Sequence, residues 1–385
     1  MSAHPFRDRI QSLLRDADVR IDGDRPWDLR MHDRRLPARL LAGGSLALGE
    51  SYMDGWWDAE SLDGLLFRLL GARVDRRAPG LADAWDALRA RVVNLQAGRR
   101  SFEVGERHYD LGNDLYGAML GKRMVYSCGY WRDAADRPLA TLDEAQEAKL
   151  DLVCRKLGLR AGMRVLDIGC GWGEALKFMA ERHGVSGVGI TVSREQATHA
   201  RELCAGLPVE IRVQDYRDLV TGRDARFDRV FSIGMFEHVG VRNYRTYFDV
   251  ARRCLAEDSP EGGLFLLHSI GHNRSVRHTD PWIARYIFPN SMLPSAAQIA
   301  EAVEGRFVIE DWHNFGHDYD LTLQAWRANI EAAWDVLPPR YDERFRRMWR
   351  YYLAGAMAGF RARRLQLWQL VLSPKGVPGG YVAPH

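Results

Sequence analysis

The stretch Arg164-Val-Leu-Asp-Ile-Gly-Cys-Gly-Trp-Gly173 decides the fold, because an apolar run breaks directly into alternating glycines. The apolar residues before the turn predict a buried parallel strand. The glycines Gly169, Gly171 and Gly173 allow a sharp turn and a close approach of the backbone to a ligand. A helical stretch follows. The pattern favours a cofactor-binding enzyme, and a glycine-rich turn without a ligand is the alternative.

The spacing of the glycines distinguishes this turn from that of dinucleotide-binding enzymes. Their pattern is G-x-G-x-x-G, whereas here the third glycine comes one position early and Asp167 precedes the turn. This variant is typical of S-adenosylmethionine-dependent methyltransferases.

Three further apolar runs follow, at residues 185–191, 209–213 and 227–233, and helical stretches separate them. This alternation predicts an α/β fold with a parallel, doubly wound sheet. Ligands of such sheets bind at the carboxyl ends of the strands. Many methyltransferases hold the ribose with an acidic residue after the second strand. This chain departs from that pattern, with Thr191-x-Ser193-x-x-Gln196 at the same place.

Several other segments occur together, in order, along almost the whole chain. They are Gly44 to Trp57, His108 to Asn113, Tyr126 to Trp131, Asp167 to Gly173, Gln214 to Asp218, Met235 to Gly240, Leu267 to Gly271 and Tyr319 to Leu323. With them the chain resembles bacterial cyclopropane-fatty-acyl-phospholipid synthases and their mycolate-modifying relatives. The resemblance implies a Rossmann-like S-adenosylmethionine-dependent methyltransferase domain preceded by a small helical domain.

The resemblance also implies the roles of individual residues. It assigns the methionine and sulfonium end of the cofactor to Tyr109, Gly169, Gly171 and Gly173, the ribose to Thr191, Ser193 and Gln196, and the adenine to Asp215 and Tyr216. Asp167 is expected to anchor the glycine turn. The side chains of Cys128, Glu237, His268 and Tyr319, with the backbone N–H of Ile270, are expected to converge on a bound bicarbonate ion.

This set suits the chemistry that ring formation requires. A cis alkene is a weak nucleophile, so it needs a strong methyl donor, and methyl transfer would leave a carbocation. Closing a three-membered ring then requires a base and a dry pocket. Glu237 as a carboxylate can only accept a hydrogen bond, so it should receive the bicarbonate O–H, while His268 and Tyr319 can donate. Aromatic walls are expected from Tyr126, Tyr130, Trp131 and Phe236, with core packing as the alternative.

Composition limits the other possibilities. The net charge of +3 does not indicate a nucleic-acid binder, although local patches could meet anionic lipid headgroups. The five cysteines are scattered without metal-ligand spacing, so we expect no metal site and a reduced, cytoplasmic protein. No stretch approaches the roughly 18 apolar residues of a spanning helix. An enzyme that acts on membrane lipids would therefore associate peripherally with the inner face of the membrane.

The sequence predicts two domains. Residues 1–95 show helical periodicity and no strand pattern of any length, and a basic linker precedes a catalytic domain at 101–385. The expected activity is methylene transfer from S-adenosylmethionine to the cis double bond of unsaturated phospholipid acyl chains, by an enzyme that the resemblance suggests is a homodimer. Alternatives are simple methylation of a lipid alkene, N-methylation of a small amine, and an inactive lipid-binding protein.

Overall fold

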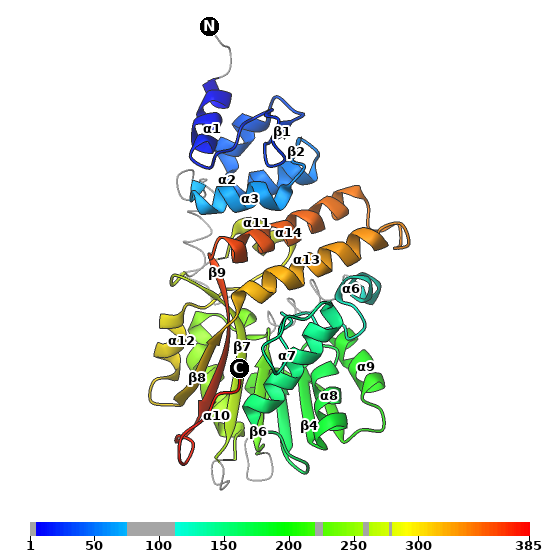
Figure 1. Ribbon diagram of the computed structural model, residues 1–385, viewed down its shortest axis with the longest axis vertical. Helices are drawn as coiled ribbons and strands as arrows, with labels where there is room; N and C mark the ends of the chain where they lie inside the picture. The colour runs from blue at the N-terminus through cyan, green and yellow to red at the C-terminus, as the bar shows by residue number, and fades with distance from the viewer. Residues whose placement is uncertain (1–4, 75–111, 220–225, 257–261, 277–278) are drawn as a thin grey trace. The chain divides into compact units, whose positions relative to one another are not determined.

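The computed structural model describes residues 5–74, 112–219, 226–256, 262–276 and 279–385 (Figure 1). By its packing the chain divides into two compact units. Unit 1 comprises Met1–Asn94, Arg277–Pro289 and Leu323–Leu365, and unit 2 comprises Leu95–Val276, Asn290–Thr322 and Gln366–His385. Unit 1 thus takes two segments from the carboxyl-terminal half of the chain, in addition to the amino-terminal residues that the sequence grouped together.

The described part of unit 2 is built around a seven-stranded sheet with the order β5-β4-β3-β6-β7-β9-β8. Its strands are Arg164–Ile168 (β3), Ser186–Thr191 (β4), Val209–Val213 (β5), Arg229–Ile233 (β6), Leu264–His272 (β7), Val308–Asn314 (β8) and Leu365–Ser373 (β9). The strands β3 to β7 pair in parallel, which confirms the predicted α/β fold. The strands β8 and β9 pair antiparallel, so the sheet is mixed rather than wholly parallel.

Both faces of the sheet are covered, which is why its central strands are almost continuously apolar. Along β3, Leu166 and Val165 belong to different core clusters, because successive side chains point to opposite faces. The Leu166 face is covered by Tyr244–Cys254 (α10) and Ala296–Val303 (α12). The Val165 face is covered by Leu142–Leu157 (α7), Glu174–His183 (α8) and Arg194–Leu203 (α9) (Figure 1).

Unit 1 is mainly helical, as the periodicity of residues 1–95 predicts. Its helices include Pro5–Arg15 (α1), Leu36–Met53 (α2), Leu62–Gly71 (α3), Pro281–Tyr286 (α11) and Glu343–Arg361 (α14). The helix Gly316–Ala333 (α13) starts in unit 2 and continues into unit 1. Two strands of two residues each, Arg30–Met31 (β1) and Trp57–Asp58 (β2), form an antiparallel ladder that the sequence did not predict.

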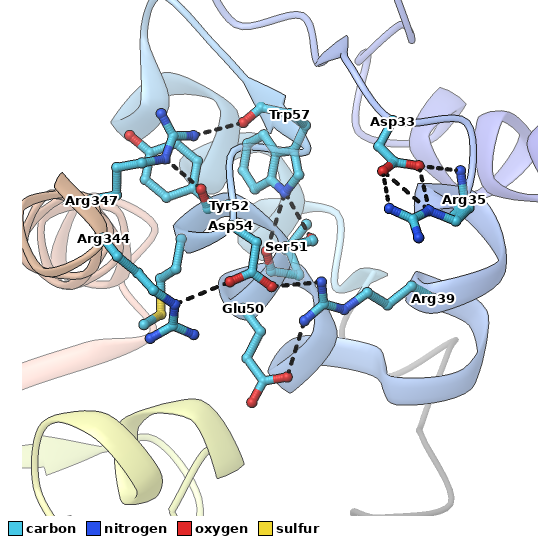
Figure 2. A network of polar contacts seen from close by, with 12 residues as sticks. Asp33, Arg35, Arg39, Glu50, Ser51, Tyr52, Asp54, Trp57, Arg344 and Arg347 are labelled. Atoms are coloured by element: carbon cyan, nitrogen blue, oxygen red, sulfur yellow. Dashed lines mark hydrogen bonds and ion pairs between the residues drawn. The ribbon is translucent and has the colours of Figure 1, made fainter.

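Arg347 connects α14 to the end of α2 within unit 1 (Figure 2). Its guanidinium donates to the carbonyl oxygens of Tyr52 at 2.5 Å and Trp57 at 2.9 Å, and to Asp58 Oδ1 at 2.7 Å. The indole N–H of Trp57 in turn donates to Ser51 Oγ at 3.0 Å. Tyr52 lies in the last turn of α2 and Trp57 begins β2, so these bonds join α14 to both elements.

No helix in the described ranges is both long and apolar enough to cross a membrane.

Candidate active site

The three glycines of the turn after β3 have different surroundings. All have positive φ, at 101° for Gly169, 53° for Gly171 and 91° for Gly173, a region that other residues rarely adopt. A Cβ on Gly169 would lie 2.6 Å from Met235 Cβ, and one on Gly173 would lie 3.0 Å from Ala200 Cβ. A Cβ on Gly171 would meet open space. Gly171 therefore borders open space, whereas Gly173 allows α8 and α9 to pack closely.

A pocket opens beside this turn at the carboxyl ends of β3, β4 and β6. It contains about 1260 Å³ of space, part of it open to solvent, which is ample for a ligand of cofactor size. Seven of the predicted cofactor residues line it: Asp167, Gly169, Gly171, Thr191, Gln196, Asp215 and Tyr216. Gly173 and Ser193 are not among its lining residues. Tyr109 lies outside the described residues.

Ser193 shapes the pocket without lining it. Its hydroxyl accepts a hydrogen bond from the backbone N–H of Gln196 at 3.2 Å and so caps α9. Thr191 Oγ1 donates to Gln196 Oε1 at 2.9 Å. On the next strand end, the guanidinium of Arg217 binds both carboxylate oxygens of Asp215, at 2.8 and 2.6 Å. This bidentate ion pair fixes Asp215 at the rim of the pocket.

The sequence reasoning missed several pocket residues. They are Met124, Val125, Ser127, Lys149, Leu150, Cys170, Trp172, Glu174, Ala175, Ile190, Val192, Gln214, Arg217, Ile233, Gly234, Met235 and His238. Seven of them belong to the segments that carry the family resemblance: Ser127, Cys170, Trp172, Gln214, Arg217, Met235 and His238. Tyr126, which was expected as an aromatic wall, also lines the pocket. The sequence gave no indication that Lys149 lies in a pocket, because a lysine within a helix ordinarily belongs to a solvent-exposed face.

Glu237 and Ile270 are in direct contact. The backbone N–H of Ile270 on β7 donates to Glu237 Oε1 at 2.6 Å, so it orients this carboxylate in the structure. The other oxygen, Oε2, is buried and has no hydrogen-bond partner among the described residues. Burial raises the pKa of Glu237 to about 7, against the lowering effect of the Ile270 N–H.

His268 lies two residues before Ile270 on β7 and is also buried. Its Nδ1 lies 3.3 Å from Gln369 Nε2. With the Gln369 amide turned so that its nitrogen faces the ring, this nitrogen donates, Nδ1 accepts, and the proton of the neutral ring is on Nε2. Burial holds the pKa of His268 well below its usual range, with smaller contributions from Lys149 and Lys156. Among the described residues Nε2 has no partner, so its N–H can donate to a ligand.

Cys128 and Tyr319 come from neighbouring segments. The hydroxyl of Thr322 on α13 accepts from the backbone N–H of Gly129 at 3.0 Å and lies 3.8 Å from Cys128 Sγ. Asp318, beside Tyr319, accepts from the backbone N–H of Trp131 at 2.7 Å. Burial raises the pKa of the Cys128 thiol well above its usual range, so the group is a neutral thiol.

Phe315 links these two groups of residues. Its ring centroid lies 5.8 Å from that of His268 and 5.4 Å from that of Tyr130, two residues after Cys128. Of the other expected aromatic walls, Phe236 stacks on Tyr244 at 4.3 Å inside the core, so ordinary packing accounts for it.

Comparisons with known proteins agree with this geometry. The family model described as mycolic acid cyclopropane synthetase matches residues 96–370. The cyclopropane-fatty-acyl-phospholipid synthase of Escherichia coli (strain K12) is 50% identical over 369 residues, 96% of this chain and 93% of that protein. The tuberculostearic acid methyltransferase UfaA1 of Mycobacterium tuberculosis (strain ATCC 25618 / H37Rv) is 34% identical over 89% of this chain and 82% of that protein.

A solved structure is similar as well. The mycolic acid cyclopropane synthase CmaA1, crystallised with S-adenosylhomocysteine and CTAB, is 30% identical, with a TM-score of 0.62 over 71% of this chain and 98% of that one. The chain therefore belongs to the mycolic acid cyclopropane synthetase family and is an S-adenosylmethionine-dependent enzyme of the methyltransferase class.

Proposed function

We propose that this enzyme transfers a methylene group from S-adenosylmethionine to the cis double bond of unsaturated acyl chains in membrane phospholipids. The observation that carries the proposal is the 50% identity, over 96% of the chain, to a cyclopropane-fatty-acyl-phospholipid synthase. The pocket at the glycine turn supports it, because the residues expected to hold the cofactor gather there. When bound, the cofactor supplies an electrophilic methyl group.

We propose that bicarbonate binds between Glu237 and His268. Glu237 Oε2 is a buried acceptor and His268 Nε2 a buried donor, and neither has a partner among the described residues. Buried polar atoms are normally paired, so a ligand that both donates and accepts suits the two. Bicarbonate has one O–H and two further oxygens, and it would supply the base that removes the proton during ring closure. Cys128 and Tyr319 would complete its surroundings.

The roles of the protein groups follow from their charge states. The neutral imidazole of His268 donates a hydrogen bond without placing a positive charge beside the ion, which would lower the basicity of the bicarbonate. The resemblance implied that the Ile270 N–H contacts the ion itself. Because this N–H already donates to Glu237 Oε1, we propose instead that it fixes the carboxylate that receives the ion's O–H. The buried setting excludes water, which would otherwise capture a carbocation.

Methyl transfer without ring closure is the second candidate, because a relative that is 34% identical is a tuberculostearic acid methyltransferase. Mass spectrometry and carbon NMR of lipids from cells that express the protein together separate the two, because a methylated alkene that loses a proton elsewhere has the same mass as a cyclopropane. Ring formation adds one CH₂ to phospholipid acyl chains and leaves a cyclopropane carbon signal by NMR. A methyl-branched chain would favour the second candidate, and unchanged lipids would contradict both.

We further propose that the enzyme works from the cytoplasm, at the inner face of the membrane, as a homodimer. The proposed substrate requires this access, since its double bonds lie inside a bilayer. Sedimentation equilibrium of the purified protein tests the dimer, and a monomer at the concentrations used for activity would contradict it.

A further inference from the structure

Lys149 on α7 is fully buried and lines the cofactor pocket. It has no carboxylate within 4.0 Å among the described residues, and its only hydrogen bond there joins Nζ to Ser127 Oγ at 3.0 Å. A buried ammonium is costly unless it is paired. Lys156, seven residues further along the same helix and equally buried, has such a partner, because its Nζ lies 2.8 Å from Asp311 Oδ2. Lys149 therefore lacks an anion that the fold supplies to Lys156.

An unpaired acid lines the same pocket. Asp167 at the end of β3 is buried, and its Oδ1 has no hydrogen-bond partner among the described residues. Lys149 and Asp167 influence each other electrostatically, yet they form no ion pair within 4.0 Å. The expected role of Asp167 as anchor of the glycine turn leaves this oxygen unexplained. Burial lowers the pKa of Lys149 to about 7 and raises the pKa of Asp167 well above its usual range, so the fold gives neither group the counter-charge that would keep it ionised.

Ser127 lies in this pocket wall as well. A lysine ammonium only donates, so Ser127 Oγ must be the acceptor of the bond from Lys149, and its own O–H is left to donate elsewhere. One helical turn before Lys149, Gln146 Nε2 donates to the carbonyl oxygen of Ser127 at 2.8 Å and holds the segment against α7. The hydroxyl is thereby fixed in place beside the ammonium.

We propose that Lys149 recognises the carboxylate of the cofactor's amino-acid end, together with the hydroxyl of Ser127 that it orients, while Asp167 faces the ammonium group. This inference rests on the proposed cofactor. An α-amino acid group carries the two charges that the pocket lacks, and Asp167 adjoins Gly169 and Gly171, where the methionine end is expected. The pair would make the pocket select nucleosides that bear an amino acid over nucleosides that do not.

The test measures binding by calorimetry with S-adenosylhomocysteine, its decarboxylated analogue and 5′-methylthioadenosine, which lacks the amino-acid end. The wild type should bind the decarboxylated analogue about 10- to 100-fold more weakly than S-adenosylhomocysteine, as expected for a lost charge-assisted hydrogen bond. Lys149→Met should lose a similar factor for S-adenosylhomocysteine and little for the other two ligands. The loss of affinity from removing the ligand's carboxylate and the loss from Lys149→Met should not add, because both remove the same contact.

Lys156→Met is the matched control, since it removes the other buried ammonium of α7 and should leave all three affinities unchanged. Equal losses of Lys149→Met for S-adenosylhomocysteine and 5′-methylthioadenosine would overturn the inference and make Lys149 a support of the pocket wall only. If Lys149→Met does not fold, the wild-type comparison alone decides, because equal affinity with and without the carboxylate would also overturn it. A wild type that binds none of these ligands would instead contradict the proposed function.

Discussion

Burial determines the protonation state of the side chains on which the proposed reaction depends. His268 and Cys128 are held neutral by their surroundings, whereas Glu237, with its pKa raised to about 7, changes charge near physiological pH. A carboxylate that must accept the bicarbonate O–H works only when it is ionised. Turnover should therefore rise as the pH increases through about 7.

The substitution Glu237→Gln keeps the size of the side chain but adds a donor where only acceptors are wanted. Turnover should fall by about 10²- to 10⁴-fold while S-adenosylhomocysteine binding persists, and added bicarbonate should restore part of the activity. Wild-type enzyme stripped of carbonate should slow in parallel. Normal turnover of the variant in carbonate-free buffer would remove both Glu237 and bicarbonate from the mechanism.

The same substitution should have a pH-dependent effect on stability. Because the folded pKa of Glu237 lies above its usual value of 4.5, its favourable contribution is complete below about pH 4.5 and is lost as the pH rises through about 7. The loss is at most about 3 kcal/mol. Glu237→Gln should thus gain stability relative to the wild type between pH 4.5 and 8, measured by urea denaturation. A pH-independent difference would show that Glu237 is not buried as a carboxylate.

A further prediction concerns Gly171→Val, because this glycine borders the pocket and has a φ of 53°. The branched side chain would occupy the ligand's place, and cofactor binding measured by calorimetry should be lost. Gly158→Val is the matched control, since Gly158 has a φ of 56° and open space around its Cβ but lies at the end of α7, away from the pocket. It should cost stability and leave binding intact. Full affinity in Gly171→Val would mean that the turn is not a ligand site.

Local sequence patterns predicted those pocket residues that directly follow the ends of strands. The apolar runs that end at Ile168, Thr191 and Ile233 are strands in the structure, and the polar residues that follow them gather at one pocket. Lys149 could not be predicted, because its burial arises only when β3, the Ser127 segment and α7 come together. Whether Glu237, His268, Cys128 and Tyr319 act together remains a prediction.

Among the elements, β8 and β9 escaped prediction for different reasons. The strand β8 lies at the sheet edge, and Val308 and Ile309 are exposed, so its apolar pattern is weak. The strand β9 follows α14 with no glycine or proline between them, and Arg363 makes the turn with a φ of 52°. A residue other than glycine rarely has a positive φ, so the sequence does not predict a turn at Arg363.

Arg347 on α14 binds carbonyl oxygens within unit 1, and its side chain is 15% exposed. We predict that Arg347→Leu lowers the free energy of unfolding by about 2–4 kcal/mol, because three hydrogen bonds from a mostly buried guanidinium are lost. Thermal or urea denaturation measures this loss.

Arg35 provides the matched control for Arg347. It binds Asp33 at 2.6 Å, but its side chain is 74% exposed (Figure 2). Exposed ion pairs contribute little, so Arg35→Leu should change stability by less than about 1 kcal/mol. Similar effects of the two substitutions would mean that the bonds from α14 to the end of α2 do not stabilise unit 1.

At the scale of the whole molecule, unit 1 is assembled from three separate stretches of the chain, so its packing depends on residues near the carboxyl terminus. The helices α2 and α3 pack on α14, almost 300 residues away in sequence. Periodicity predicted α2 and α3, because it reports which face of a helix is apolar. It could not identify the partner helix, since many apolar faces could serve equally well.

The last prediction concerns the membrane, where the proposed substrate resides. The chain carries a formal net charge of +3, so attraction to an anionic bilayer should be modest and should depend on local arrangement rather than on total charge. Surface charges are screened over about 10 Å at roughly 0.1 M salt. Vesicles that contain anionic phospholipid should therefore bind the protein and raise its activity more than zwitterionic vesicles with the same acyl chains, and added salt should diminish the difference. Vesicle sedimentation and lipid product analysis measure the two effects. Equal binding to both kinds of vesicle at every salt concentration would show that charge has no part in bringing the enzyme to its substrate.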